Sequence, residues 1–180
     1  EAVYQDHVLV PYHLIETSTK ITDDGLTYEK LDEEEREQYE DEFCEDDGLV
    51  DHIPPEKINT YIFNRDTVDI MISDLMNHGI KHKNGNHVGK TIIFAQNKRH
   101  AKYIIERFDV LYPQYKGAFC KLVVCDEPYA EKNLEDFKKP DEYPFITVTV
   151  DMLETGVDVP EITNLVFAKK VYSRIKFEQM

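Results

Sequence analysis

Residues 148–160 have the types and spacing that would place a ligand-binding loop at the end of a strand. The stretch begins at the end of an apolar run and contains a single glycine, Gly156. Asp158 follows between two valines, and Pro160 comes next after the second valine. In a doubly wound sheet, ligands bind beyond the carboxyl ends of the strands. An ordinary strand-to-loop passage is the alternative, but we favour ligand contact because the spacing is so particular.

A second stretch, Gly89-Lys90-Thr91, imitates the end of a phosphate-binding P-loop. That motif needs a glycine five positions before Gly89, where this chain has Asn84, with Gly85 one position too late. The three residues also precede an apolar strand-like run, whereas bound phosphates need the start of a helix there. We therefore exclude a P-loop, and no other glycine in the chain completes one.

Two weaker patterns have simpler explanations. Residues 125–127 follow an apolar run and imitate a magnesium-binding acid pair, but without a P-loop an acidic loop is the better interpretation. Three histidines, His78, His82 and His87, are spaced closely enough to suggest a metal site. Glycines interrupt any helix that would align them, so we expect a solvated loop and no metal site.

Apolar runs and helical patterns alternate along residues 66–168, which predicts an α/β fold with a parallel sheet and helices on both faces. The expected strands cover residues 91–95, 122–125, 145–150 and 162–168. One helix is expected to start at Asp66, which we expect to cap it, and to end at Gly79, and a short helix is expected to cover 131–138. Another is capped by Asn97, and its apolar face is Ala101, Ile104, Ile105, Phe108 and Leu111.

The first part of the chain differs in character. Residues 8–15 are apolar and predict an edge strand, and residues 31–47 are rich in carboxylates and predict a solvated acidic helix. Two prolines follow Ile53, and we place a domain boundary there, with a short helix at 55–63. The predicted organisation is an acidic β/α arm at 1–53 and an α/β domain at 54–180.

Charge is distributed unevenly along the 180 residues. The net charge of -15 lies in residues 1–60, which hold 19 acids and 4 bases, while residues 61–180 hold 17 of each. Residues 81–121 carry 9 bases and 2 acids. Phosphate binding is therefore possible, although a strong and self-sufficient DNA-binding function is excluded. Three cysteines without a framework spacing fit a reducing compartment, and no apolar run is long enough to span a membrane.

Several stretches together resemble superfamily 2 helicases. Residues 148–160 resemble motif V of the second RecA-like domain in that class, residues 90–101 resemble motif IV, and residues 173–180 resemble the approach to motif VI, which begins at Gln179. Within the class, the chain is most similar to the motor (R) subunit of type I restriction enzymes. It departs from the usual motif V at Val150, where a threonine is common, so this position has no hydroxyl to contact DNA.

The resemblance implies a site divided between nucleotide and DNA. The residues that it places at ATP are Glu154, Thr155, Gly156 and Asp158. The residues that it places along the DNA backbone are Gln96, Asn97, Lys98, Arg99, Thr149, Val150, Asp151 and Met152. A glycine lets backbone approach a ligand, an aspartate can accept from a ribose hydroxyl, and the start of a helix offers free N–H groups to phosphate. For Lys98 and Arg99, an exposed helix start is an equally good explanation.

The resemblance also implies the activity and the partners. Residues 54–180 would be the second RecA-like domain of an ATP-dependent DNA translocase and type I endonuclease, and residues 1–53 its connection to the first. ATP and Mg²⁺ would bind with the parent protein, and no catalytic residue is expected in this chain, which should be inactive alone because the P-loop and the motif VI arginines are missing. Expected partners are double-stranded DNA, the first RecA-like domain, and the methyltransferase and specificity subunits, in a bacterial or archaeal cytoplasm. The alternatives are a repair or remodelling helicase and a non-catalytic interaction module.

Overall fold

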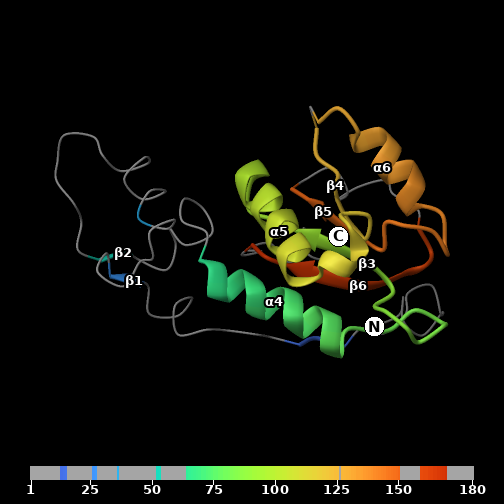
Figure 1. The fold of residues 1–180 in the computed structure, drawn as a ribbon, viewed down its shortest axis with the longest axis horizontal. Coiled ribbons are helices and arrows are strands. Elements are labelled where there is room, and N and C mark those ends of the chain that lie inside the picture. The colour runs from blue at the N-terminus through green and yellow to red at the C-terminus, as the bar shows by residue number, and fades with distance from the viewer. Residues whose placement is uncertain are drawn as a thin grey trace, which may run out of the picture.

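A parallel sheet of four strands lies at the core of the fold (Figure 1). A computed structural model describes residues 13–15, 26–27, 36, 52–53, 64–125, 127–150 and 159–169. The strands run in the order β4-β5-β3-β6, where the order along the chain is β3 (Lys90–Phe94), β4 (Cys120–Leu122), β5 (Ile146–Thr149) and β6 (Ile162–Phe167).

Strand β3 is central, and every one of its five residues is buried. Ile92 pairs in parallel with Thr147 of β5 on one side and with Leu165 of β6 on the other. A strand with neighbours on both edges and helices on both faces has no polar side, which explains its nearly continuous apolar sequence.

Helix α4 (Arg65–His78) precedes the sheet and begins one residue earlier than the sequence pattern predicts. Its cap is Asn64, whose Oδ1 accepts a hydrogen bond of 2.9 Å from the backbone N–H of Thr67, so the expected capping role of Asp66 was wrong. The helix ends at Gly79 as predicted, with the Gly79 N–H donating to the Leu75 carbonyl.

Helix α5 (Lys98–Leu111) follows β3 and is capped by Asn97, as predicted. The predicted apolar face is confirmed: Ala101, Ile104 and Phe108 are fully buried, at the three- and four-residue steps of one helix face. A short 3-10 helix, η3 (Pro113–Tyr115), ends this segment. Arg107 of α5 donates two hydrogen bonds, of 2.8 and 2.6 Å, to the carboxylate of Asp69 on α4, which joins the two helices.

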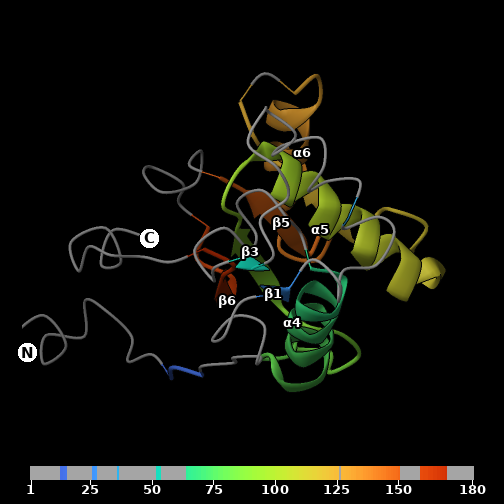
Figure 2. The same ribbon diagram turned by 90° about the vertical axis from the view of Figure 1, so that its left-hand side faces the viewer.

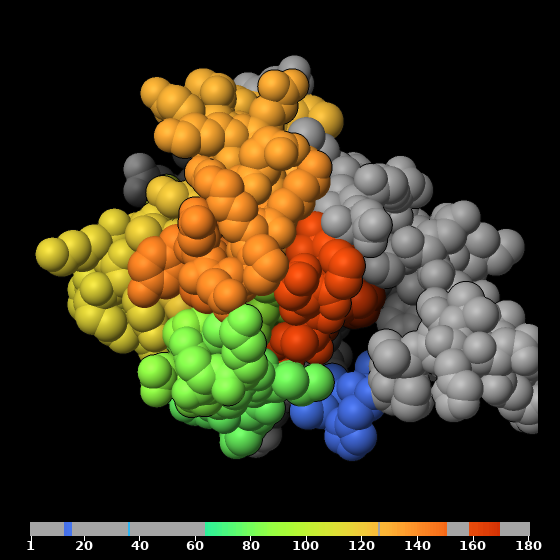
Figure 3. Space-filling model, turned by 90° about the vertical axis from the view of Figure 1, so that its right-hand side faces the viewer, coloured from blue at the N-terminus to red at the C-terminus, as the bar shows by residue number. Residues whose placement is uncertain are grey.

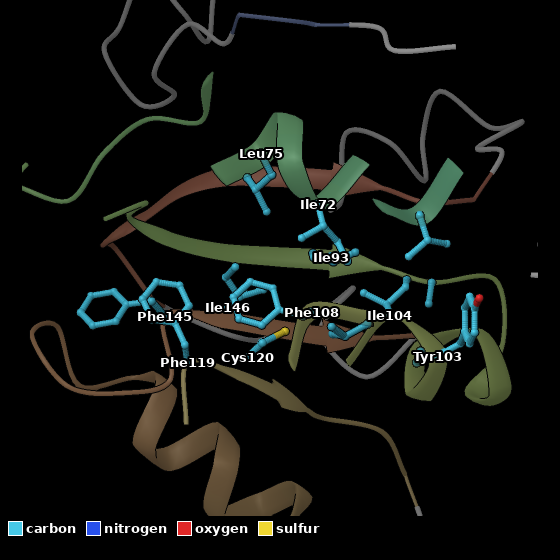
Figure 4. Packing of buried hydrophobic residues seen from close by; sticks show 14 of the residues in the cluster. Ile72, Leu75, Ile93, Tyr103, Ile104, Phe108, Phe119, Cys120, Phe145 and Ile146 are labelled. Carbon is cyan, nitrogen blue, oxygen red and sulfur yellow. The ribbon is translucent and has the colours of Figure 1, made fainter. Parts of the chain in front are cut away.

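The helices cover both faces of the sheet. Helices α4 and α5 lie together on one side (Figure 2), where Ile72, Ile93, Ile104 and Phe108 point toward one another in the larger hydrophobic cluster (Figure 4). Helix α6 (Ala130–Phe137) covers the other face, where its Phe137 packs in a second cluster with Ile92, Phe94, Val123 and Val159. The predicted fold class, a RecA-like α/β sheet with helices on both faces, is confirmed.

The pairing of β6 with β3 contains an irregularity. Lys90 is opposite Ile162, but Thr91 is opposite Asn164, so Thr163 is an extra residue on β6. Because side chains alternate along a strand, one extra residue reverses which face later side chains occupy. Ile162 and Phe167 can therefore both pack into the α6 cluster although they are an odd number of residues apart.

Strand β4 lies earlier in the chain than the sequence predicts. Residues 122–125 were expected as a strand, but β4 ends at Leu122. Val123 and Val124 are nevertheless buried, and the Val123 N–H donates to the Val148 carbonyl at 2.9 Å. The apolar run therefore marks burial accurately and the extent of the strand less well.

The acidic arm is described at a few positions. Strand β1 (Leu26–Thr27) pairs antiparallel with β2 (His52–Ile53), residues 13–15 have no regular secondary structure, and Arg36 is helical. Most of the predicted edge strand at 8–15, the acidic helix at 31–47 apart from Arg36, and the whole predicted helix at 55–63 lie outside the described residues. The boundary after residue 53 stays a prediction.

Candidate functional site

The ends of β3, β5 and β6 meet at one edge of the sheet, because the strands are parallel. Just beyond β3, the Ala95 N–H donates to the Thr149 carbonyl at 2.7 Å, while the Ala168 N–H donates to the Phe94 carbonyl at 2.9 Å. We call the loops that follow β3, β4, β5 and β6 the carboxyl edge. In open α/β sheets this is where ligands bind, so the fold places the expected site here.

Lys169 joins two of these strand ends. Its Nζ donates a 2.8 Å hydrogen bond to the Val150 carbonyl, and the ammonium lies 5.8 Å from the centre of the Phe94 ring. The cation therefore fixes the position at which the chain leaves β5. Sequence reasoning did not single out Lys169, because nothing in its local pattern shows which carbonyl it contacts.

The turn into α5 brings the predicted residues 96–99 together at the carboxyl edge. The Asn97 Oδ1 accepts a 2.8 Å hydrogen bond from the His100 N–H. The Gln96 N–H donates to the Nδ1 of His100 at 3.3 Å. With Asn97 occupied as the cap, the exposed side chains of this turn are Gln96, Lys98 and Arg99.

His100 supports this turn from inside the molecule. It is only 1% exposed, and burial lowers the pKa of its imidazole from 6.5 to about 4, because the charged ring is disfavoured away from water. The ring is therefore neutral at pH 7, and its Nδ1 can accept from Gln96. No local pattern in the sequence signals this role.

Lys98 also has a partner that sequence reasoning missed. The Nζ atoms of Lys98 and Lys102 each lie 2.9 Å from the same Oε1 atom of Glu127, in the loop that follows β4. Hydrogen bonds from Lys102 and Lys98 lower the pKa of the Glu127 carboxyl. Glu127 therefore belongs to an ion cluster at the carboxyl edge. Its pairing with two lysines accounts for an acidic residue at this position without a magnesium site.

Thr149 and Val150 occupy the end of β5. Thr149 is fully buried, and its Oγ1 atom has no hydrogen-bond partner in the described part of the chain. A contact between the Thr149 hydroxyl and DNA therefore does not fit this conformation. Val150 is half-buried, and its carbonyl accepts from Lys169.

The remaining predicted site residues lie outside the described residues. For the DNA contacts these are Asp151 and Met152, for ATP they are Glu154, Thr155, Gly156 and Asp158, and for motif VI the residue is Gln179. The described residues end at Val150 and resume at Val159, which is buried in the hydrophobic cluster beneath α6. These assignments stay predictions.

The excluded P-loop has a structural explanation at the opposite edge of the sheet. Lys90 is buried, and its Nζ donates to the carbonyls of Glu142 and Pro144 at 2.8 and 2.7 Å, which ties residues 142–144 to the start of β3. Burial lowers the pKa of Lys90 from 10.5 to about 8. A Cβ atom on Gly89 would lie 2.3 Å from the Thr163 Oγ1, so the glycine allows β6 to approach. Gly89 and Lys90 therefore serve packing at the start of β3.

The histidine loop is more ordered than expected. The rings of His82 and His87 stack with centroids 5.0 Å apart, His87 packs on Phe145, and the Nε2 of His82 lies 3.0 Å from an Asp141 carboxylate oxygen. The expected solvated loop was therefore wrong for these two side chains. Figure 3 shows this end of the molecule, where the green segment that contains the loop packs against the orange and red segments. Among the described residues, no group of three or more potential ligands could hold a metal ion.

A cavity of about 350 Å³ opens between the second half of α5, β4 and α6. Its lining mixes apolar side chains with charged ones, including Ile105, Asp109, Lys121 and Glu127. Glu127 thus borders both this cavity and the ion cluster. Within the described residues, no helix is long and apolar enough to cross a membrane.

Residues 68–180 match the helicase conserved C-terminal domain family. The match covers more than half of the chain, so the chain belongs to this family. The chain is further similar to the R subunit of type I restriction enzymes. It is 40% identical over 99 residues to the type I restriction enzyme EcoKI endonuclease subunit of Escherichia coli K12, and the matched part is 51% of this chain and 8% of that subunit.

A solved structure supports the fold. A fragment assigned as the HsdR subunit of a type I restriction enzyme from Vibrio vulnificus superposes with a TM-score of 0.52 at 23% identity, covering 64% of this chain and 24% of that one. The helicase domain of Hef from Pyrococcus furiosus gives a TM-score of 0.44 at the same identity, over 64% of this chain and 21% of that one. At this identity the first likeness establishes the fold alone.

Proposed function

We propose that this chain is part of the ATP-dependent DNA-translocating subunit of a type I restriction enzyme. In that role it supplies the second RecA-like half of an ATP cleft and part of the track for duplex DNA. The observation that carries the proposal is the 40% identity to the EcoKI endonuclease subunit, in a chain of the helicase C-terminal family.

The geometry of the carboxyl edge supports a DNA track. Exposed Gln96, Lys98 and Arg99 follow β3 at the start of a capped helix, where the positive end of the helix dipole and cationic side chains favour phosphate. Contacts of this kind are independent of base sequence, as a protein that moves along DNA requires. Motion would come from closing and opening of the two RecA-like domains around ATP and Mg²⁺.

The partners follow from the same proposal. The parent protein would act in a bacterial or archaeal cytoplasm with the methyltransferase and specificity subunits of the complex. The first RecA-like domain would supply the P-loop that this chain lacks, and would bind ATP and Mg²⁺. ATP contacts from this chain would come from Glu154, Thr155, Gly156 and Asp158, and DNA contacts from the turn at 96–99 together with residues 150–152, since the Thr149 side chain is buried.

The test is Asp158→Ala in the full-length protein, measured as DNA-stimulated ATP turnover and as translocation on duplex DNA. Both rates should fall at least about tenfold, a loss of about 1.4 kcal/mol of transition-state stabilisation. Glu161→Ala, an exposed carboxylate three residues away, is the control and should keep normal rates. Normal turnover in Asp158→Ala would contradict the nucleotide role, and ATP turnover that duplex DNA does not stimulate in the wild type would favour an interaction module.

A further inference from the structure

The carboxyl edge contains a cluster of three charged side chains that no comparison assigns. Lys98 and Lys102 are one helical turn apart on α5, so they share a face, and both ammonium groups converge on one oxygen of Glu127 at 2.9 Å. The lysine side chains are 44% and 50% exposed, and the Glu127 side chain is 22% exposed. We call these three residues the Lys-Glu-Lys cluster.

The charges of the cluster do not cancel. Two ammonium groups face one carboxylate, which leaves a net positive charge, and each ammonium has further N–H donors. Two cations that converge on one anionic oxygen can bind a phosphate oxygen in the same way. Lysine suits such a contact because its ammonium is a compact point charge on a flexible stem.

The position of the cluster is also informative. Lys98 directly follows the turn after β3, whereas Glu127 belongs to the loop after β4, and β5 lies between those two strands in the sheet. The cluster therefore links the first turns of α5 to the loop that follows β4. The cluster adjoins the turn that contains Gln96 and Arg99, which the proposed function places against the DNA backbone.

Lys90, at the start of β3, and Lys169, just after β6, are engaged differently. Lys90 and Lys169 donate to backbone carbonyls within the fold, and Lys90 is buried. Those contacts hold the chain together and are not available for exchange. An ion pair between partly exposed side chains contributes little to stability, so an incoming anion can replace the Glu127 carboxylate at little energetic cost.

We infer that a backbone phosphate of nucleic acid binds between Lys98 and Lys102 by replacing the carboxylate of Glu127, which acts as an internal competitor for that phosphate. Lys102 thus becomes a DNA contact and Glu127 a positioning residue that keeps both ammonium groups converged and weakens the bound state. A weak contact suits a protein that must release each phosphate as it moves. This inference rests on the proposed function, because the phosphate belongs to the proposed DNA track.

The test measures binding of a short fluorescein-labelled DNA duplex to the 180-residue chain by anisotropy, at roughly 50 and 200 mM salt. Glu127→Gln should bind about threefold to fivefold more tightly at the lower salt, since it removes the competing carboxylate. Glu131→Gln removes the same charge from an exposed position on α6 and is the matched control, expected to give a smaller gain. The Glu127→Gln variant should also show a steeper dependence of affinity on salt, because its lysines release more counterions.

The lysine side of the cluster has its own pair of variants. Lys102→Gln should weaken binding about threefold to fivefold and cancel most of the gain from Glu127→Gln in the double variant. Lys102→Arg should retain binding, and Lys132→Gln, on exposed α6 surface, should have less effect than Lys102→Gln.

The outcomes separate the inference from the function on which it rests. Equal affinities and salt slopes for Glu127→Gln and Glu131→Gln, in a chain that binds duplex DNA, would overturn the inference and leave the proposed DNA track intact. Absence of salt-dependent binding in the wild type and in every variant would overturn both. Inorganic phosphate could also displace the labelled duplex at a concentration equal to that of the duplex phosphates. That result would show a simple anion site and would overturn the inference.

Discussion

His100 is the residue that sets the conformation of the turn entering α5. Its N–H is held by the Asn97 cap, and its buried ring accepts the Gln96 N–H, so the two residues before α5 depend on a neutral imidazole. An imidazolium has no acceptor left on either nitrogen. Protonation would remove the Gln96 hydrogen bond and place an unfavourable charge in the interior.

We expect acid to destabilise the chain through His100. The folded pKa of about 4 lies below the ordinary value of 6.5, so the unfolded chain binds the proton first as the pH falls. The neutral His100 ring should contribute about 2 to 4 kcal/mol to the free energy of unfolding at pH 7. This contribution should decline as the pH falls below 6.5 and be lost by about pH 4. Urea unfolding at pH 7, 6 and 5 should show the wild type losing stability relative to His100→Gln, whose side chain does not titrate. Parallel pH profiles for the two proteins would contradict this expectation.

Burial also explains why single residues of the site were hard to predict. Thr149 matches a DNA-binding motif position, yet it ends a strand whose residues are all buried, so its side chain lies inside. Lys98 was expected to contact DNA or to lie at an exposed helix start; its side chain is exposed, but its ammonium group also pairs with Glu127, which the sequence did not indicate. Both outcomes depend on contacts between residues far apart in the sequence, which local patterns do not contain.

The regular elements were predicted well wherever one period dominated. The apolar face of α5 and the continuous apolar run of β3 are local signals that packing then satisfies. The displaced β4 and the cap of α4 show the limit of such signals. An apolar run reports burial, while the end of a strand depends on where its neighbour stops pairing, and two nearby polar residues, Asn64 and Asp66, are both plausible caps.

The pairing of α4 with α5 is expected to depend on Arg107 and Asp69. Their bidentate contact is largely shielded, with side chains 18% and 23% exposed, so it should exceed the value of an ordinary surface pair. In a double-mutant cycle with Arg107→Met and Asp69→Asn, we expect a coupling energy of about 1 to 2 kcal/mol from urea unfolding. The exposed pair of Lys139 and Asp136 on the far side of the sheet is the control and should give less than about 0.5 kcal/mol. Equal coupling energies in the two cycles would show that the bidentate contact between Arg107 and Asp69 contributes no more to stability than an exposed ion pair.

At the scale of the molecule, the two ends of the sheet have different tasks. The amino end is closed by buried or packed polar groups, with Lys90 on two carbonyls and Asn164 of β6 exchanging hydrogen bonds with the backbone of Ile80. The carboxyl edge presents exposed Gln96, Lys98 and Arg99 instead. The polar side chains of the amino end are largely buried or packed, whereas several of those at the carboxyl edge are exposed to solvent.

The distribution of charge over the whole chain leads to the last prediction. Residues 1–52 hold 18 acids and 3 bases, so the remaining residues 53–180 are neutral overall and include the basic stretch 81–121. Like-charge repulsion between the arm and DNA acts over about 10 Å at 0.1 M salt. Deleting residues 1–52 should therefore tighten binding to duplex DNA at low salt, and the difference between the two chains should shrink as salt rises.

Charge reversal locates the source of that gain. If the turn at 96–99 faces DNA, replacing both Lys98 and Arg99 by glutamate in the 53–180 chain should abolish the gain and reduce the magnitude of the salt slope by roughly 0.9 for each phosphate that the protein no longer neutralises. Reversal of Lys138 and Lys139, next to α6, introduces the same charge change away from that turn and serves as the control. Anisotropy titrations of the three proteins at two salt concentrations measure both effects. Equal binding by the two reversed proteins would mean that the arm acts through net charge alone, and that the start of α5 is an exposed helix end without a part in the DNA track.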